Sequence, residues 1–122
     1  MNAPHFPRQG SVYLSKALKQ GGDTKKRPVL VVSVDSRNQY SRTVLVVPFS
    51  SDITASTGHP GRVVVNIPEG GLERPSVALC DLITTVEKHY LDQQPYGMIQ
   101  PQTFQHVQQG ILMAIGIYDE LM

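Results

Sequence analysis

Three cations on consecutive residues stand immediately before a proline and a long apolar run. Lys25, Lys26 and Arg27 precede Pro28. Positive charges attract phosphate groups whatever base they carry. Arg27 differs from the two lysines because the proline and the strand behind it fix its backbone, so its planar guanidinium can grip a phosphate with two hydrogen bonds. The segment predicts a phosphate-binding site; a solvated loop with an ordinary arginine at the strand start is the alternative.

Hydroxyl and carboxylate side chains follow two other apolar segments. Ser50 and Ser51 come directly after one of them, and Asp81 follows the other. A serine at such a position is commonly a helix cap or turn residue, but it can also hydrogen-bond a phosphate. Asp81 is suited either to accept hydrogen bonds from loop amides or to act as a general base beside a cation. His59, in the turn of residues 58–61, is the histidine best placed to contact a ligand.

Several common catalytic and metal-binding motifs are absent from the sequence. It contains no phosphate-binding GxxxxGK[ST] loop, no HExxH and no Gly-x-Ser-x-Gly turn. Cys80 is the only cysteine, which excludes an internal disulfide and a cysteine-based metal site. These absences exclude a disulfide scaffold and a zinc finger, and the sequence offers no motif for a cofactor.

Short strands must position these residues, and we predict them at residues 12–14, 28–34, 43–49, 62–67, 76–79 and 82–86. Residues 28–34 are almost all apolar and rich in valine, which predicts a strand in the middle of the sheet that is buried on both faces. Pro48 has no N–H for a ladder, so it predicts a bulge, an edge position or a strand end. Residues 15–26 lack any period and contain Gly21-Gly22-Asp23, which predicts a mobile loop leading into the central strand.

The periodicity changes near the C-terminus. Apolar residues recur at three and four positions from Phe104 to Leu121, opposite several glutamines, and Pro101 suits a first helical position. Gly110 and Gly116 each cost roughly 1 kcal/mol in a helix relative to Ala, so packing must hold this helix, and a close backbone approach would explain the glycines. Five or six strands closed by one helix predict a mainly β fold with some α, built as a small, strongly curved antiparallel sheet or barrel.

Length and composition fit a single domain over residues 1–122. The chain is 40% hydrophobic and 17% charged, with ten glycines and nine prolines, a turn-rich composition that excludes disorder, collagen and coiled coil. Residues 1–9 are polar and Pro-rich, which predicts a flexible tail rather than a secretory signal. No apolar run approaches the ~18 residues of a membrane-spanning helix. We predict a cytoplasmic protein that does not enter a membrane.

The net charge of +1 hides an uneven distribution. Residues 1–61 carry eight Lys/Arg against three Asp/Glu, whereas residues 62–122 carry three against seven. Such asymmetry fits an anionic partner for one face, or an acidic-against-basic contact between subunits. A solvated surface is the other interpretation.

Five blocks of the chain, in their order and separations, match those of a known family. They are Gly10-Ser11-Val12-Tyr13, residues 26–33 (KRPVLVVS), Asn38, residues 46–51 (VVPFSS) and residues 78–86 (ALCDLITTV). In these blocks the chain resembles the MazF/PemK/Kid family of toxin endoribonucleases from bacterial toxin–antitoxin modules. The matches span nearly the whole chain, and the RPVLVVS block followed by VVPFSS is the most specific of them.

This resemblance implies the PemK/CcdB fold, an SH3-like barrel with a C-terminal helix. It also implies a homodimer, a groove for single-stranded RNA across the dimer interface, cleavage without a metal, and an antitoxin partner with an acidic tail. Arg27 and Ser50 would be the usual catalytic pair, and Asp81 stands where some members add an aspartate. We expect Arg27 to stabilise charge, Ser50 to hydrogen-bond the phosphate or the 2′-hydroxyl, and Asp81 to act as base or in positioning. The residues expected to bind RNA are Lys25, Lys26, Ser51 and His59.

The chain departs from the family pattern at three places. It has Gly21-Gly22-Asp23-Thr24 where a Gly-x-Glu-Gln-like stretch is common, Ser50 where Thr is more usual, and Leu82 where a glutamine is common. Two other functions therefore stay open. One is a non-catalytic nucleic-acid- or peptide-binding module on the same fold. The other is a CcdB-like gyrase inhibitor, although the chain lacks the Trp-Gly-Ile-type C-terminus of that family.

Overall fold

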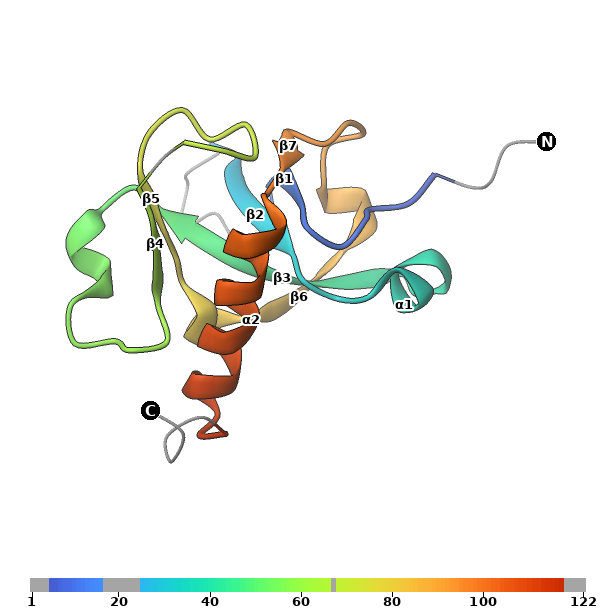
Figure 1. Ribbon diagram of the computed structural model, residues 1–122. Helices are drawn as coiled ribbons and strands as arrows, with labels where there is room; N and C mark the ends of the chain where they lie inside the picture. The colour runs from blue at the N-terminus through green and yellow to red at the C-terminus, as the bar shows by residue number, and fades with distance from the viewer. Residues whose placement is uncertain (1–4, 17–24, 67, 118–122) are drawn as a thin grey trace.

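The fold is a curled antiparallel sheet with one long helix packed against it (Figure 1). A computed structural model describes residues 5–16, 25–66 and 68–117. The strands are β1 (Ser11–Ser15), β2 (Arg27–Val31), β3 (Thr43–Ser50), β4 (Val63–Val65), β5 (Ser76–Ala78), β6 (Thr84–Glu87) and β7 (Gly97–Met98). The helices are α1 (Asp35–Tyr40), α2 (Pro101–Ala114) and the short 3-10 helices η1 (Ile53–Ser56), η2 (Cys80–Leu82) and η3 (Lys88–Tyr90).

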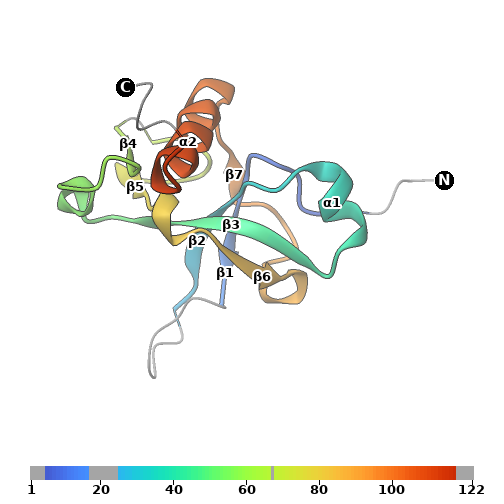
Figure 2. The same cartoon turned by 90° about the horizontal axis from the view of Figure 1, so that it is seen from below.

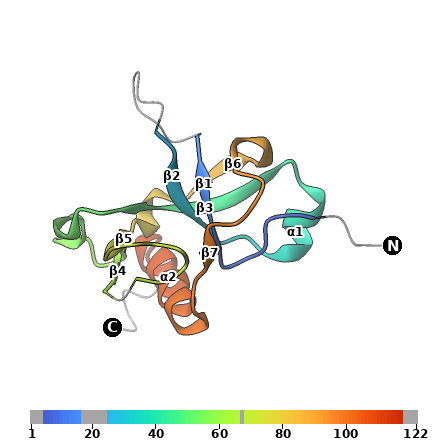
Figure 3. The ribbon, with the colours of Figure 1, turned by 90° about the horizontal axis from the view of Figure 1, so that it is seen from above.

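The sheet follows the order β4-β5-β3-β2-β1-β7, and β6 also pairs with β3. β2 lies inside the sheet, as its apolar run predicts. Figures 2 and 3 show β2 crossing β3 obliquely, and only three residue pairs, from Val29–Pro48 to Val31–Val46, join the two strands. This strong curvature confirms the predicted fold class, a mainly β fold with a C-terminal helix.

Alternate residues of β2 and β3 fill two separate hydrophobic clusters. Leu30 and Val47 lie in the cluster that includes Val107 of α2. Val29 and Val46 lie in the second cluster. All five side chains are completely buried. Because successive side chains of a strand point to opposite faces, this arrangement explains why the sequence shows an unbroken apolar run rather than an alternating one.

Two glycines allow α2 to approach the sheet closely. A Cβ added to Gly110 would lie 2.4 Å from the carbonyl oxygen of Gly61 and 2.8 Å from Sγ of Cys80. No side chain fits at that distance, so the close backbone approach is the reason for a glycine inside the helix. Burial raises the pKa of the Cys80 thiol to about 11, so it stays protonated near neutral pH.

The ends of α2 are set by local chemistry. The helix begins at Pro101, as predicted, and the Glu69 carboxylate accepts hydrogen bonds from Gln100 N (2.6 Å) and Thr103 Oγ1 (2.9 Å) at its first turn. A carboxylate there satisfies N–H groups that have no partner within the helix. The helix ends at Ala114, earlier than the apolar pattern predicts.

A buried polar network ends the predicted strand 28–34 three residues early. Asn38 of α1 is completely buried, donates from Nδ2 to the Ser33 carbonyl (2.8 Å) and accepts from the Ser33 hydroxyl. Leu45 N donates to the same hydroxyl (3.0 Å), which ties α1 to β3. Buried polar groups must find partners, and here they stabilise a short helix that the hydrophobic pattern did not predict.

The packed fold begins earlier in the chain than the sequence predicts. Residues 5–9 belong to the predicted tail, yet Phe6 is only 7% exposed and the Arg8 guanidinium lies 4.0 Å from its ring centroid. Arg8 also lies 3.5 Å from the Asp35 carboxylate, and Gln9 N donates to the same side chain (2.8 Å). The aromatic ring and these contacts hold the segment against α1. Most of the predicted loop, residues 17–24, lies outside the described residues.

We expect Gly110→Ala to lower the free energy of unfolding by roughly 1–3 kcal/mol, because forcing a methyl group into a packed contact exceeds the gain of about 1 kcal/mol in helix propensity. Urea unfolding followed by circular dichroism measures the change. Gln109→Ala, at the exposed neighbouring position, is the matched control and should change stability little. A Gly110→Ala protein more stable than the wild type would contradict this account of the contact.

Candidate active site

Arg27 and Ser50 lie where two paired strands separate. Arg27 is the exposed first residue of β2, and Ser50 is the half-buried last residue of β3. The last pair of the β2–β3 ladder is Val29–Pro48, so each of the two residues stands two positions beyond it. By the alternation of side chains along a strand, both leave the sheet on the same face. The register thus directs a guanidinium and a hydroxyl, 23 residues apart in the sequence, to one side of the sheet.

The Ser50 hydroxyl takes part in the turn that follows β3. Its Oγ accepts a hydrogen bond from Asp52 N (3.1 Å), and the Asp52 carboxylate in turn accepts from Thr54 N (3.0 Å) at the start of η1. The turn role considered for this serine is therefore present. A hydroxyl that accepts one hydrogen bond keeps its own proton to donate, so Ser50 can still reach a phosphate oxygen.

The two lysines before Arg27 are both on the surface. Lys25 and Lys26 are both exposed, at the start of the segment that enters β2. The Lys26 ammonium donates to the Asp92 carboxylate at 2.6 Å. An exposed pair of this kind contributes little to stability and can exchange one anion for another. Both lysines thus place exposed positive charge directly before Arg27 in the chain.

Asp81 is held by an arginine that the sequence analysis did not single out. Both of its carboxylate oxygens accept from Arg62, from Nε at 2.7 Å and from Nη2 at 3.1 Å. Arg62 Nη1 donates to the Ala55 carbonyl of η1 (2.8 Å), and its side chain is only 14% exposed. Arg62 thus fastens η2, which carries Asp81, to η1, the short helix that follows Ser50.

The pairing sets the proton affinity of Asp81. The hydrogen bonds from Arg62 lower the pKa of the Asp81 carboxyl below its usual value, and the nearby charge of His59 lowers it further. A carboxylate with a lowered pKa is a weaker base. The geometry therefore favours the positioning role among those considered for Asp81.

Ser51 and His59, the other residues predicted to bind RNA, both lie in the segment between β3 and β4. Ser51 is exposed directly after β3, and His59 is exposed in the turn whose carbonyl accepts from Arg62 N (2.9 Å). His59 lies close enough to Asp81 for its charge to act on that carboxyl, as described above. Among residues 5–16, 25–66 and 68–117, no three His, Cys, Asp or Glu side chains are grouped as a metal site would require.

Comparison with known proteins decides the family. The sequence profile of the PemK-like, MazF-like toxins of type II toxin–antitoxin systems matches residues 8–115. This chain belongs to that family. The resemblance predicted from the sequence is confirmed.

Relatives of known name agree with the assignment. A protein named Endoribonuclease MazF from Staphylococcus saprophyticus is 28% identical over 116 residues, which cover 91% of this chain and 92% of the relative. Crystal structures of MazF from Deinococcus radiodurans (TM-score 0.72, 18% identity, 93% of this chain and 99% of that one) and of a mycobacterial endoribonuclease in complex with its cognate antitoxin (TM-score 0.69, 23% identity, 96% and 97%) share the fold.

The family assignment narrows the alternatives left open by the sequence. A CcdB-like gyrase inhibitor is not favoured, because the profile that matches is that of PemK-like and MazF-like toxins.

The described part of the chain was also compared with what a membrane span requires. None of its helices has the length and apolar character that a crossing needs.

Replacing Asp81 by Asn should lower the melting temperature at pH 7, and the difference from the wild type should vanish in acid. The pKa of Asp81 is lowered in the folded state. Its charge therefore contributes stability above the ordinary carboxyl pKa of about 4, and that stability is lost as the pH falls through the lowered value. Thermal melts at a series of pH values measure the effect.

Glu73→Gln is the matched control, because Glu73 is exposed and makes no ion pair within the described part of the chain. Its melting temperature should follow the wild type at every pH. A stability difference for Asp81→Asn that persists unchanged into strong acid would show that the charge of Asp81 is not what stabilises this region.

Proposed function

We propose that this toxin-family protein is an endoribonuclease that cleaves single-stranded RNA by attack of the ribose 2′-hydroxyl on the adjacent phosphate. The observation that carries the proposal is the placement of Arg27 and Ser50, two residues past the last β2–β3 pair and on one face of the sheet. A guanidinium and a hydroxyl can both donate hydrogen bonds to the negative charge that develops on a phosphate, which needs no metal.

In the reaction, the 2′-oxygen bonds to phosphorus and passes its proton to a water molecule, while the bond from phosphorus to the 5′-oxygen breaks and that oxygen takes a proton from water, leaving a 2′,3′-cyclic phosphate and a 5′-hydroxyl. Negative charge accumulates on the phosphate oxygens as the new bond forms. Arg27 stabilises this charge with two hydrogen bonds, and Ser50 donates a third that orients the phosphate. An arginine stays charged near neutral pH, so electrostatic stabilisation suits it better than proton donation.

We assign the remaining predicted residues to binding and positioning. Lys25 and Lys26 hold neighbouring phosphates, with Lys26 exchanging its Asp92 partner for the RNA backbone. Ser51 and His59 contact the RNA beyond the cleaved bond. Asp81, through Arg62, fixes η1 relative to η2 and so supports the turn that contains Ser50.

We further propose two protein partners, a second copy of this chain and a cognate antitoxin. A homodimer with the RNA groove across its interface follows from the family resemblance. An antitoxin with an acidic tail suits the cations at residues 25–27, since carboxylates bind where phosphates bind. A toxin that acts on RNA works in the cytoplasm, where its substrate and its antitoxin are made.

Arg27→Ala should reduce cleavage of single-stranded RNA by about 10²–10³-fold, because a donor aimed at developing charge is lost. Gel analysis of purified protein with a long single-stranded RNA, in buffer containing EDTA, measures the rate. Arg74→Ala, an exposed arginine on the loop between β4 and β5, is the control and should keep the wild-type rate. Full cleavage by Arg27→Ala, or loss of wild-type cleavage on chelation, would defeat the mechanism.

For Ser50, replacement by Ala should lower the cleavage rate by about tenfold or more, whereas Ser50→Thr should retain most of it because the hydroxyl is kept. The RNA dissociation constant, measured with 2′-O-methyl RNA that cannot be cleaved, should change less than the rate. Tight binding of unmodified RNA by the wild type without any cleavage would instead favour the alternative of a non-catalytic binding module.

A further inference from the structure

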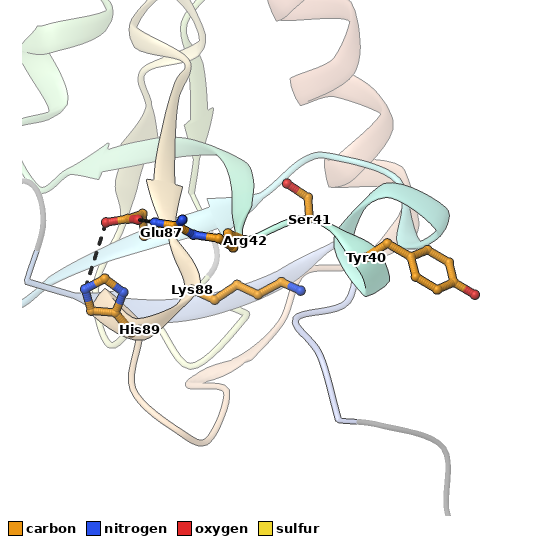
Figure 4. A pocket seen from close by; sticks show the side chains of 6 residues that line it. All are labelled: Tyr40, Ser41, Arg42, Glu87, Lys88 and His89. Atoms are coloured by element: carbon orange, nitrogen blue, oxygen red, sulfur yellow. Dashed lines mark hydrogen bonds and ion pairs between the residues drawn. The ribbon is translucent and has the colours of Figure 1, made fainter.

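A hollow lined by charged and polar residues lies at the end of β3 opposite Ser50. It has a volume of about 300 Å³ and is lined by Tyr40, Ser41, Arg42, Glu87, Lys88 and His89 (Figure 4). α1 stands at this end of β3 and η1 at the other, in every view of the fold (Figures 1–3). None of the residues to which we assign a role in the reaction lines this hollow.

The walls of the hollow are fixed by hydrogen bonds. Arg37 of α1 donates to the Thr43 carbonyl (2.8 Å) and to the Thr43 hydroxyl (3.0 Å), and Thr43 N donates to the Ser41 hydroxyl (3.1 Å). On the other side, Lys88 N donates to the Arg42 carbonyl (2.9 Å). Arg42 and Lys88 therefore face each other just beyond the last pair of the β3–β6 ladder, Thr43–Glu87.

Positive charge exceeds negative charge in the hollow. Glu87 is its only carboxylate, and it accepts from Arg42 at 2.7 Å and lies 3.9 Å from His89 Nε2. Lys88 makes no ion pair with any described residue, and Figure 4 shows its side chain extended across the hollow toward Ser41. Its ammonium is thus available to an anion from outside the chain.

Aromatic rings stand on both sides of this charge. The Tyr40 side chain points outward at the rim (Figure 4), and the residue is 83% exposed. The His89 ring packs on that of Tyr90 with centroids 4.3 Å apart. Cations between exposed aromatic faces are the combination by which proteins hold single-stranded nucleic acid, since phosphates meet the cations and unstacked bases meet the rings. An acidic peptide would use the cations, but it does not present a planar base beside each charge for the rings to stack on.

The position of the hollow relates it to the proposed cleavage site. β3 spans eight residues, which corresponds to roughly 23 Å at about 3.3 Å per residue. Arg42 continues the alternation of β3 onto the face that Ser50 shares. Val44 and Val46, which lie between Arg42 and Ser50 on that face, are buried. The hollow and the surface around Ser50 are therefore separate sites at the two ends of β3.

We propose that this hollow is a second binding site for single-stranded RNA, which holds a phosphate at Lys88 and a base against Tyr40 several nucleotides away from the cleaved bond. The inference rests on the proposed endoribonuclease function and adds to it. A contact remote from the chemistry strengthens RNA binding and so lowers the KM. It leaves the bond-breaking step, and therefore kcat, unchanged.

The test compares short and long RNA that cannot be cleaved. Cleavage is first mapped on a natural RNA, and two 2′-O-methyl oligonucleotides are then made. The short RNA contains the cleaved site and its nearest neighbours. The long RNA adds about ten nucleotides on each side, a length typical of single-strand sites. For the long RNA, Lys88→Gln should lower the salt dependence of log K by about 0.7, the value of one phosphate contact. Tyr40→Ala should weaken binding about fivefold or more without changing the salt dependence.

Matched variants separate the site from general effects. Tyr40→Phe should bind like the wild type, because it keeps the ring, and Arg74→Ala should leave the salt dependence unchanged. Binding of the short RNA, and its cleavage when unmodified, should be the same for all four variants. The proposal would be overturned if Lys88→Gln and Tyr40→Ala bound the long RNA as tightly as the wild type does. It would also be overturned if the two variants lost affinity only for an acidic peptide such as poly-glutamate. A wild-type protein that cleaves no RNA would refute the endoribonuclease function. The hollow would then be decided by binding of the same variants to a long 2′-O-methyl RNA of mixed sequence, for which no cleavage site has to be mapped.

Discussion

The short ladder between β2 and β3 is the constraint on which the candidate site depends. Leu30 and Val47 form its middle pair, and every ladder residue except the partly buried Pro48 is completely buried. A slip of one residue would exchange the contents of the two hydrophobic clusters, so the register is strongly specified. The same slip of one residue would put Arg27 and Ser50 on opposite faces. The packing of valines and a leucine thus places the two polar groups that we assign to the chemistry.

Sequence reasoning succeeded where one local pattern determines the structure. The valine run at residues 28–34 predicted the central strand, and strand ends predicted where Arg27 and Ser50 stand in the sheet. Their roles stay a prediction. The Arg62–Asp81 pair could not be found this way, because its members are 19 residues apart and only the curvature of the sheet joins them. α1 was missed because a buried Asn38 network, rather than an apolar period, holds it.

The uneven charge of the two chain halves is partly balanced inside the fold. Lys26 pairs with Asp92 and Arg42 with Glu87, so in each case a cation from the basic half meets a carboxylate from the acidic half. These contacts within one chain account for two of the seven carboxylates of the acidic half. Lys88 is a cation of the acidic half that makes no such pair within the described residues, and it stands at the far end of the strand that ends in Ser50.

Serine in place of the threonine that is more usual in the family is compatible with the proposed role of Ser50. A threonine side chain is restricted at χ1 by its branch, whereas a serine hydroxyl has more freedom to rotate. In this chain the hydrogen bond from Asp52 N holds the Ser50 oxygen in place. Asp52 is itself fixed by its bonds to Thr54, and η1 by the bond from Arg62 to Ala55. The turn therefore supplies the orientation that branching would otherwise supply, so the structural and chemical roles of this serine support each other.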